Sequence, residues 1–381
     1  MRILHTSDWH IGRTLHKVPM LDAQRTALQQ ICTVAADEDV DLVVVAGDVF
    51  DHAVPSADAL EVLEETLATL LLIAPVVVTA GNHDSLRRLG YGSRLFSEGL
   101  HVCTRVGDVG RALVFGDVRV YPLPYLHPDT ARVDLQAADE PLVATHHAVM
   151  SEAMQRVHAD LAEHPGAGSV VVAHAWVAGA DTSDSERDVS VGGLGTIPPA
   201  VFEGVDYVAL GHLHGPQEPR RVGSTRLRYS GSPLRYSFSE ASQEKSVTIV
   251  DLGPDGVTDL WTVPIAQPRG MVVLRGLIDE LLDPALHADH VQDWVSAVVT
   301  DDRRPSQMWP RLQERFGHLL QVRHEPSTGF VHDRPAAVGS EQKPLEVAGD
   351  FVEYVTNGQI NPQESAAFEQ AVQTVRGREQ S

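Results

Sequence analysis

The chain has 381 residues, of which 43% are hydrophobic and 22% are charged, the balance of a soluble globular protein. This length allows one large domain together with one or two smaller ones. The net charge of −22 argues against a protein that binds nucleic acid through a basic surface of its own. Bound metal ions or a partner subunit can supply positive charge instead, so nucleic acid remains open as a substrate.

Cysteine usage and the absence of targeting signals predict a soluble cytoplasmic protein. Cys32 and Cys103 are the only cysteines and lack a C-x-x-C spacing, which favours a reducing compartment. No signal peptide precedes the first polar motif at Asp8. The longest apolar run, residues 67–80, is interrupted by Pro75 and is too short to span a bilayer, so we expect no membrane partner.

The first eighty residues alternate predicted strands and helices. Apolar runs indicate the strands, and apolar residues at helical spacing indicate the helices. The predicted strands are residues 2–6, 41–46 and 76–79, and the predicted helices are residues 21–37 and 55–71. This alternation predicts a parallel or mixed α/β sheet that is covered by helices.

Four later apolar runs predict further strands, at residues 170–173, 207–210, 227–229 and 246–250. A group of polar residues follows the end of most predicted strands. Open α/β sheets bind their ligands at the carboxyl ends of their strands. We therefore expect these polar residues to converge on one site.

The character of the chain changes around Pro264–Pro268. We expect four segments: a large domain over 1–258, a small α/β domain over 259–326, a linker over 327–343 and a helical hairpin over 344–381. The linker is rich in Gly, Pro and charged residues. Within the hairpin, Gly358 can end the first helix, and residues 361–364 form a start signal for the second.

Five short segments carry the chemistry of the chain. They are Asp8-Trp9-His10, Gly47-Asp48, Gly81-Asn82-His83-Asp84, Ala173-His174 and Gly211-His212-Leu213-His214. Aspartate, asparagine and histidine suit Mn²⁺ or a similar divalent ion. Each segment alone can be an ordinary turn or a surface histidine, but five of them in one α/β chain favour a site for two metal ions.

Charge and ligand number suggest how the residues divide between the two ions. Asp48 can bridge them, while one ion takes Asp8, His10 and His214 and the other takes Asn82, His174 and His212. The ions would be Mn²⁺ or alternatively Mg²⁺. After the negative charges of Asp8 and Asp48 are subtracted, two divalent ions leave a net charge of about +2, enough to bind a phosphodiester and lower the pKa of a water.

His83 is not needed as a ligand, so we expect it to neutralise or protonate the leaving oxygen. Asp84 either orients the His83 imidazole or is an exposed turn residue. Asp51 and His52 are expected beside the ligands. Four further histidines are expected to be solvated at the surface: His146, His147, His158 and His164.

These motifs resemble those of the calcineurin-like metallophosphoesterase superfamily. The flanking sequence is similar to the SbcD-type nuclease subunits in residues 3–12, 47–51, 183–187, 207–214, 229–234 and 245–247. The resemblance implies a sandwich of mixed sheets flanked by helices. It also implies that residues 259–326 form a DNA-capping domain and that the C-terminal hairpin holds a partner.

The implied function is a manganese-dependent nuclease acting on DNA ends and hairpins in repair, recombination and replication. The implied partners are DNA, an SMC-type ATPase that controls the nuclease through ATP, and a second copy of the chain within a heterotetramer. The enzyme would associate with the nucleoid when it acts.

Two other functions remain open from the sequence. One is a small-molecule or cyclic-nucleotide phosphodiesterase with the same metal site, and the other is a scaffold subunit with an inactive site. Two groups of arginines beside the motifs can track phosphates or be solvated. They are Arg87, Arg88 and Arg94 in the first group, and Arg220, Arg221, Arg226, Arg228 and Arg235 in the second.

Overall fold

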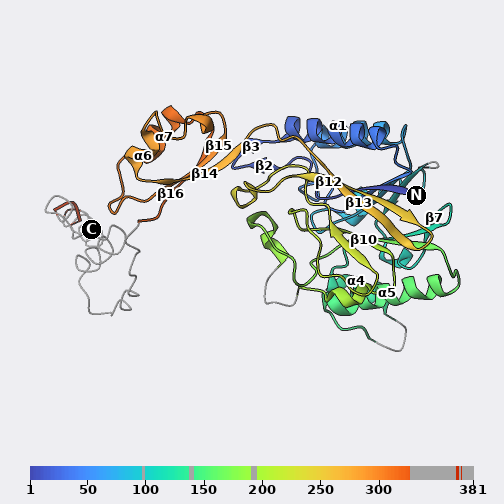
Figure 1. Cartoon of the computed structure of the whole chain (residues 1–381). Coiled ribbons are helices and arrows are strands. Elements are labelled where there is room, and N and C mark those ends of the chain that lie inside the picture. The colour runs from blue at the N-terminus through green and yellow to red at the C-terminus, as the bar shows by residue number, and fades with distance from the viewer. Residues whose placement is uncertain (97–98, 137–140, 190–194, 327–365, 369, 371–381) are drawn as a thin grey trace, which may run out of the picture. The chain divides into compact units, whose positions relative to one another are not determined.

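The chain divides into two compact units, residues 1–268 and 269–381. The structure, a computed structural model, describes residues 1–96, 99–136, 141–189, 195–326, 366–368 and 370 (Figure 1). The first unit extends past the boundary expected at residue 258, because β13 (Gly256–Pro264) pairs with β12 (Ser246–Gly253) and so belongs to its first sheet.

The first sheet of this unit has six strands in the order β13-β12-β1-β4-β5-β6. Its other strands are β1 (Arg2–Thr6), β4 (Leu42–Ala46), β5 (Val76–Thr79) and β6 (Leu100–Cys103). Strands β1, β4, β5 and β6 run parallel, whereas β12 is antiparallel to β1. The carboxyl ends of β1, β4, β5 and β6 therefore lie at one edge.

The second sheet has five strands in the order β11-β10-β9-β8-β7. They are β7 (Leu113–Phe115), β8 (Val118–Leu123), β9 (Gly168–His174), β10 (Tyr207–Gly211) and β11 (Arg226–Tyr229). All neighbours are parallel except β7 and β8. Both sheets are thus mixed, as the sequence predicts. The short strands β2 (Thr14–Leu15) and β3 (Val18–Pro19) form a separate hairpin.

The two sheets pack face to face over a buried aliphatic core. Val44 of the first sheet and Val170 and Val172 of the second belong to this core and are fully buried. Two of the helices, α1 (Leu21–Asp37) and α2 (Ala57–Leu70), pack against each other. On the side of the second sheet lie α4 (Pro128–Leu135) and α5 (His146–Ala162), as Figure 1 shows. A single turn, α3 (Leu86–Leu89), follows β5.

The second unit contains a parallel sheet of three strands, in the order β14-β15-β16. The strands are β14 (Met271–Gly276), β15 (Trp294–Val299) and β16 (Leu319–His324), and the helices are α6 (Ile278–Leu282) and α7 (Met308–Arg315). Leu281, Leu312 and Phe316 are fully buried against this sheet. The linker and most of the hairpin expected from the sequence lie outside the described residues.

Short 3₁₀ turns complete the described elements, at Val106–Asp108, Asp184–Val189, Pro199–Phe202, Phe238–Glu240 and Ala288–His290. Among the described helices, none combines the length and the apolar character that crossing a membrane requires.

Candidate metal centre

The predicted ligands lie where strands of both sheets end. Asp8 follows β1 and Asp48 follows β4, and the backbone N–H of Asp8 donates to the carbonyl of Gly47 at 3.1 Å. From the second sheet, His174 is the last residue of β9 and pairs in register with Gly211 at the end of β10. The face-to-face sheets thus bring segments that are distant in sequence together.

The backbone is strained at several of these positions. The φ angles are 53° at Asp8, 45° at His10, 49° at Asp48 and 105° at His212, in the left-handed region that residues other than Gly rarely adopt. Such conformations cost roughly 1–3 kcal/mol each and persist only where the surroundings enforce them. Their concentration here is typical of a functional site.

Glycines allow the loops to approach one another. A Cβ atom at Gly81 would overlap the Asp48 carboxylate, and one at Gly211 would overlap the carbonyl oxygen of Ala46. A side chain at position 81 would displace the neighbouring loop after β4, and one at position 211 would force the two sheets apart at this edge. The Gly-Asn and Gly-His pairs of the motifs therefore have a packing reason as well as a chemical one.

The side-chain atoms of the first predicted ligand set converge. Nε2 of His10 lies 3.1 Å from Nε2 of His214 and 3.6 Å from Oδ2 of Asp48. Asp8, His10 and His214 can each point one ligand atom to a common position, with all such atoms within 4.8 Å of one another. All four side chains are buried.

The second set meets on the other side of Asp48. Oδ2 of Asp48 lies 3.4 Å from Nε2 of His174. The amide oxygen of Asn82 lies 3.0 Å from the same nitrogen and 3.1 Å from Nδ1 of His212. Asp48 thus stands between the two groups, where the sequence analysis expects a bridging carboxylate.

The outer nitrogens of two histidines are held by oxygen atoms, as is usual for metal-bound imidazoles. Nδ1 of His174 lies 2.9 Å from the carbonyl oxygen of Ala46, and Nδ1 of His214 lies 2.8 Å from Oγ of Ser185. Within the described residues, Nδ1 of His10 makes no hydrogen bond, but it lies 3.5 Å from Oδ1 of Asp51, within ion-pair distance. In each ring the other nitrogen therefore faces the centre.

The electrostatics of the centre favour a cation. Burial lowers the pKa of His10 to about 3, so the ring is neutral and its Nε2 can act as a ligand. Burial raises the pKa of Asp8 to about 6. Burial also opposes charge on His174, but the Asp48 carboxylate outweighs it and raises the pKa of His174 to about 9. Buried carboxylates here attract positive charge, and the donor set fits divalent ions.

His83 lies at the mouth of the centre. Its ring packs edge-on against His10 with centroids 4.8 Å apart, and its Nδ1 lies 2.9 Å from the carbonyl oxygen of Asp51. The mouth is a cavity of about 410 Å³ lined by Asp51, His52, Ala53, Asn82, His83, Tyr125 and His127. A side-chain atom of His83 also falls within 4.8 Å of ligand atoms of His10 and Asp48.

The structure corrects the expectation that Asp84 orients the His83 ring. The Asp84 carboxylate is buried and accepts backbone N–H groups from Val49 and Phe50 at 3.0 Å and from Gly81 at 2.9 Å. It therefore joins the loop after β4 to the loop after β5. The Asp51 carbonyl, and not Asp84, contacts the imidazole of His83.

Comparison with known proteins agrees with this geometry. Residues 1–216 match the calcineurin-like phosphoesterase family. The chain is 31% identical to the SbcD subunit of the SbcCD nuclease from Staphylococcus saprophyticus over 328 residues, which cover 85% of each protein. The chain belongs to the calcineurin-like phosphoesterase family.

Within this family the chain is a homologue of the SbcD-type subunits. Residues 267–356 match a second family, described as the type 5 capsule protein repressor C-terminal domain. Two solved structures also match 70% of this phosphoesterase and 99% of their own chains. They are TT1561 of Thermus thermophilus, with 16% identity and a TM-score of 0.42, and a dimetal phosphatase from Danio rerio, with 13% identity and a TM-score of 0.43.

In this phosphoesterase His214 also contacts a buried polar network that was not predicted from the sequence. Oγ of Ser185 contacts Nδ1 of His214 and donates to Oε1 of Glu240 at 2.5 Å. Nζ of Lys245 donates to the other oxygen of Glu240 at 2.6 Å and to the carbonyl oxygen of His214 at 2.8 Å. The similarity of residues 183–187 and 245–247 to SbcD-type subunits was the available signal.

Three arginines of the second group have partners within the fold, whereas Arg220 and Arg221 are exposed. Arg226 donates to Glu218 at 2.6 Å, Arg228 donates to Thr248 at 3.3 Å, and Arg235 donates to the carbonyl oxygen of Gln243. These three side chains therefore serve structure, which weakens the expectation that they track phosphates.

Histidines outside the motifs have varied surroundings. His164 is exposed, as expected, but the half-buried ring of His146 packs near Tyr125 with centroids 5.9 Å apart. His5 is fully buried and bonds the Tyr207 hydroxyl at 2.8 Å, so it serves the core between the sheets.

Proposed function

We propose that this phosphoesterase is the nuclease component of an SbcCD-like complex that hydrolyses DNA phosphodiester bonds at double-strand ends and hairpins. Its place would be in DNA repair and recombination. The observation that carries the proposal is the convergence of six buried or half-buried ligand side chains around Asp48. The similarity to a relative that is named as part of a nuclease supports DNA as the ester.

The proposed ligand sets are those of the sequence analysis, with Asp48 shared. Asp8, His10 and His214 would hold one ion, and Asn82, His174 and His212 the other. Two divalent ions, Mn²⁺ by our proposal, would neutralise a phosphodiester and make water a stronger nucleophile near neutral pH. No thiolate is present among these ligands, which suits Mn²⁺ or Mg²⁺ better than a soft metal.

His83 is the proposed general acid of the reaction. Its Nδ1 can donate to the Asp51 carbonyl, which fixes the ring and leaves Nε2 to carry the proton for the leaving oxygen. Its position in the wall of the mouth cavity gives it access to a bound phosphodiester. Asp84 supports this geometry indirectly by holding the two loops together.

The experiment is a cleavage assay on linear and hairpin DNA with Mn²⁺, with and without an SMC-type ATPase subunit. We expect cleavage of both substrates, its loss in His83→Ala with metal binding retained, and little change in the control His164→Ala just beyond the exposed end of α5. Rapid turnover of simple phosphomonoesters with no action on DNA would instead favour a small-molecule phosphoesterase.

The proposed assembly includes the ATPase and a second copy of the chain. The net charge of −22 leaves little general attraction for DNA, which makes help from a partner valuable. Apolar side chains available to a second copy are Leu60 of α2 and, after α3, Tyr91 and Leu95, which are 50%, 85% and 87% exposed.

Molar mass in solution tests the homodimer. We expect light scattering to give twice the chain mass, and Tyr91→Asp with Leu95→Asp to shift it toward the monomer. Val133→Asp on α4, where the side chain is 57% exposed, is the matched control and should leave the mass unchanged. A monomeric wild-type protein at high concentration would refute the homodimer.

A further inference from the structure

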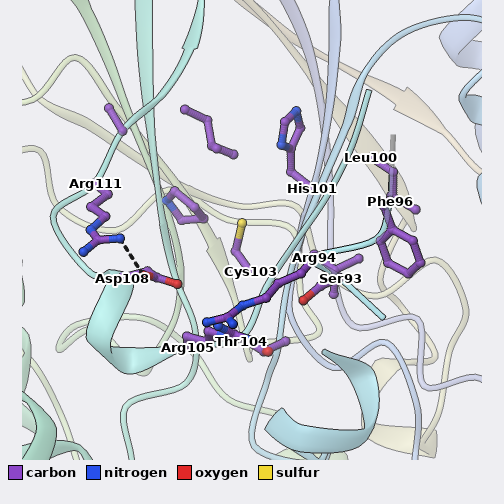
Figure 2. A pocket seen from close by; sticks show the side chains of 14 residues that line it. Ser93, Arg94, Phe96, Leu100, His101, Cys103, Thr104, Arg105, Asp108 and Arg111 are labelled. Carbon is purple, nitrogen blue, oxygen red and sulfur yellow. Dashed lines mark hydrogen bonds and ion pairs between the residues drawn. The ribbon is translucent and has the colours of Figure 1, made fainter. Parts of the chain in front are cut away.

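A large pocket lies where the free edges of the two sheets meet. β6 ends the first sheet and β7 ends the second, and all four residues of β6 are only half-buried. The pocket has a volume of about 690 Å³ and lies between β6, β7, β8 and the segments around them (Figure 2). It contains none of the predicted metal ligands.

The pocket combines a cationic rim with an apolar floor. Arg94 and Arg105 contribute to the rim, and Figure 2 shows their guanidinium groups beside Thr104 on the same side. Leu100, Val102, Leu113 and Pro122 supply apolar surface, and the ring of Phe96 stands at one end.

The charges of the rim are unbalanced. Arg111 is paired with Asp108 at 3.1 Å. Within the described residues, by contrast, no side-chain hydrogen bond or ion pair is recorded for Arg94 or Arg105, and both are exposed. Adjacent unpaired guanidinium groups in a protein of net charge −22 favour an anion, and planar guanidinium groups suit a phosphate.

We propose that this pocket binds an aromatic phosphate ester of nucleotide size, with its phosphate on Arg94 and Arg105 and its flat base over the apolar floor. A volume of about 690 Å³ exceeds the space that a phosphate alone requires and falls in the range of small-ligand sites. A base on an apolar floor gains free energy from stacking and burial, which a bare anion does not.

The pocket borders the edge at which the metal centre lies. Arg105 comes shortly after the carboxyl end of β6, and β6 is the neighbour of β5, whose end leads to Asn82. The ligand is therefore either a free mononucleotide or the terminal nucleotide of a DNA strand. The second source rests on the proposed nuclease function, whereas the first does not.

Calorimetric titration of the full-length protein in EDTA tests the site without cleavage. The probes are deoxyadenosine monophosphate, deoxyadenosine, inorganic phosphate, and a short single strand with or without a 5′-phosphate. We expect the monophosphate to bind at least roughly tenfold more tightly than deoxyadenosine or phosphate alone, since each lacks one half of the contacts. Tighter binding of the phosphorylated strand than of the monophosphate would assign the strand end, and the reverse would assign the free nucleotide.

The variant Arg94→Ala/Arg105→Ala should bind the monophosphate more weakly by a factor of about ten or more, since each charge-assisted contact contributes roughly that factor to the affinity. Arg87→Ala/Arg88→Ala on the neighbouring α3 is the matched control, because neither residue lines the pocket. Both changes are at the surface, and circular dichroism checks the fold. Three results would overturn the proposal: an equal loss of monophosphate affinity in both double variants, no loss in Arg94→Ala/Arg105→Ala, or equal affinity of the wild type for phosphate and monophosphate. Because EDTA removes the metals, a failed nuclease assay leaves this result interpretable.

Discussion

Replacing Lys245 by Met tests whether the buried network behind His214 stabilises the fold. The Lys245 side chain has no exposed surface, and its ammonium group contacts Glu240 at 2.6 Å, Ser232 at 3.1 Å and the His214 carbonyl at 2.8 Å. Burial disfavours the Glu240 carboxylate, but Lys245 and His214 together outweigh that effect and hold the pKa of Glu240 well below its ordinary value.

The expected loss of stability follows from the Glu240 carboxylate, which the substitution leaves buried without a cation. Without Lys245, Glu240 keeps a buried carboxylate that has lost its cation, and removing one partner of a buried ion pair costs about 3–5 kcal/mol. For a domain of this size that corresponds to a fall in Tm of roughly 6 to 20 °C. Lys245→Met with Glu240→Gln removes both charges, so we expect the double variant to recover part of the loss.

Differential scanning fluorimetry of the full chain measures the shift, with Mn²⁺ affinity measured by titration in parallel. Because Lys245 also holds the His214 backbone, we expect weaker Mn²⁺ binding in Lys245→Met. The matched control is Lys17→Met, an exposed lysine on the turn between β2 and β3. A loss below about 1 kcal/mol for Lys245→Met would refute the reasoning, because that is the range of an exposed ion pair.

Three further outcomes follow from the structure. Asp84→Ala should lower Tm and weaken Mn²⁺ binding, measured by titration, since buried backbone donors lose their acceptor at roughly 1–3 kcal/mol each; Asp84→Asn should be milder. Mn²⁺ at a hundredfold excess over Kd should raise the free energy of unfolding by about 2.7 kcal/mol and therefore raise Tm, and Asn82→Ala should reduce that rise. Partial burial opposes charge on Asp160, but hydrogen bonds from Tyr121 and Arg119 lower the pKa of its carboxyl group. The ionised Asp160 therefore stabilises the fold fully above the unfolded pKa of about 3.9, and this contribution is lost as the pH falls through the lower folded pKa. The Tm difference between wild type and Asp160→Asn should therefore shrink between about pH 5 and pH 3.

Sequence patterns predicted the elements that carry their own periodicity or an unbroken apolar run. The predicted strand at residues 2–6 and the predicted helix at 21–37 agree with β1 and α1 in their bounds. The strands β6, β7 and β8 were missed. At the free edge, β6 is half-buried throughout, so neither alternation nor an apolar run marks it. Its position comes from pairing with β5 alone.

The site was predictable where residue type determines its chemistry, and less so where side-chain direction decides. Asp8 and His212 could be recognised as candidate ligands after strands, and in the structure the backbone N–H of His212 donates to Oδ1 of Asp8 at 3.0 Å. The role of Asp84 could not be recognised, because an aspartate beside a histidine in sequence can turn either way. The contact of Glu240 and Lys245 with His214 also depends on turns that no local pattern specifies.

The distribution of positive charge connects these findings. In a chain of net charge −22, arginines near the motifs looked like the means of attracting a phosphate. Arg226 and Arg228 instead lie beside Glu218, so ion pairing cancels much of their field. Within the described residues, Arg94 and Arg105 keep their charge available, one strand beyond the end of β5. With the cations that we propose around Asp48, a phosphate ester approaching this edge would meet net attraction in two places, at those cations and at the arginine rim, and the acidic remainder of the surface disfavours other modes of binding.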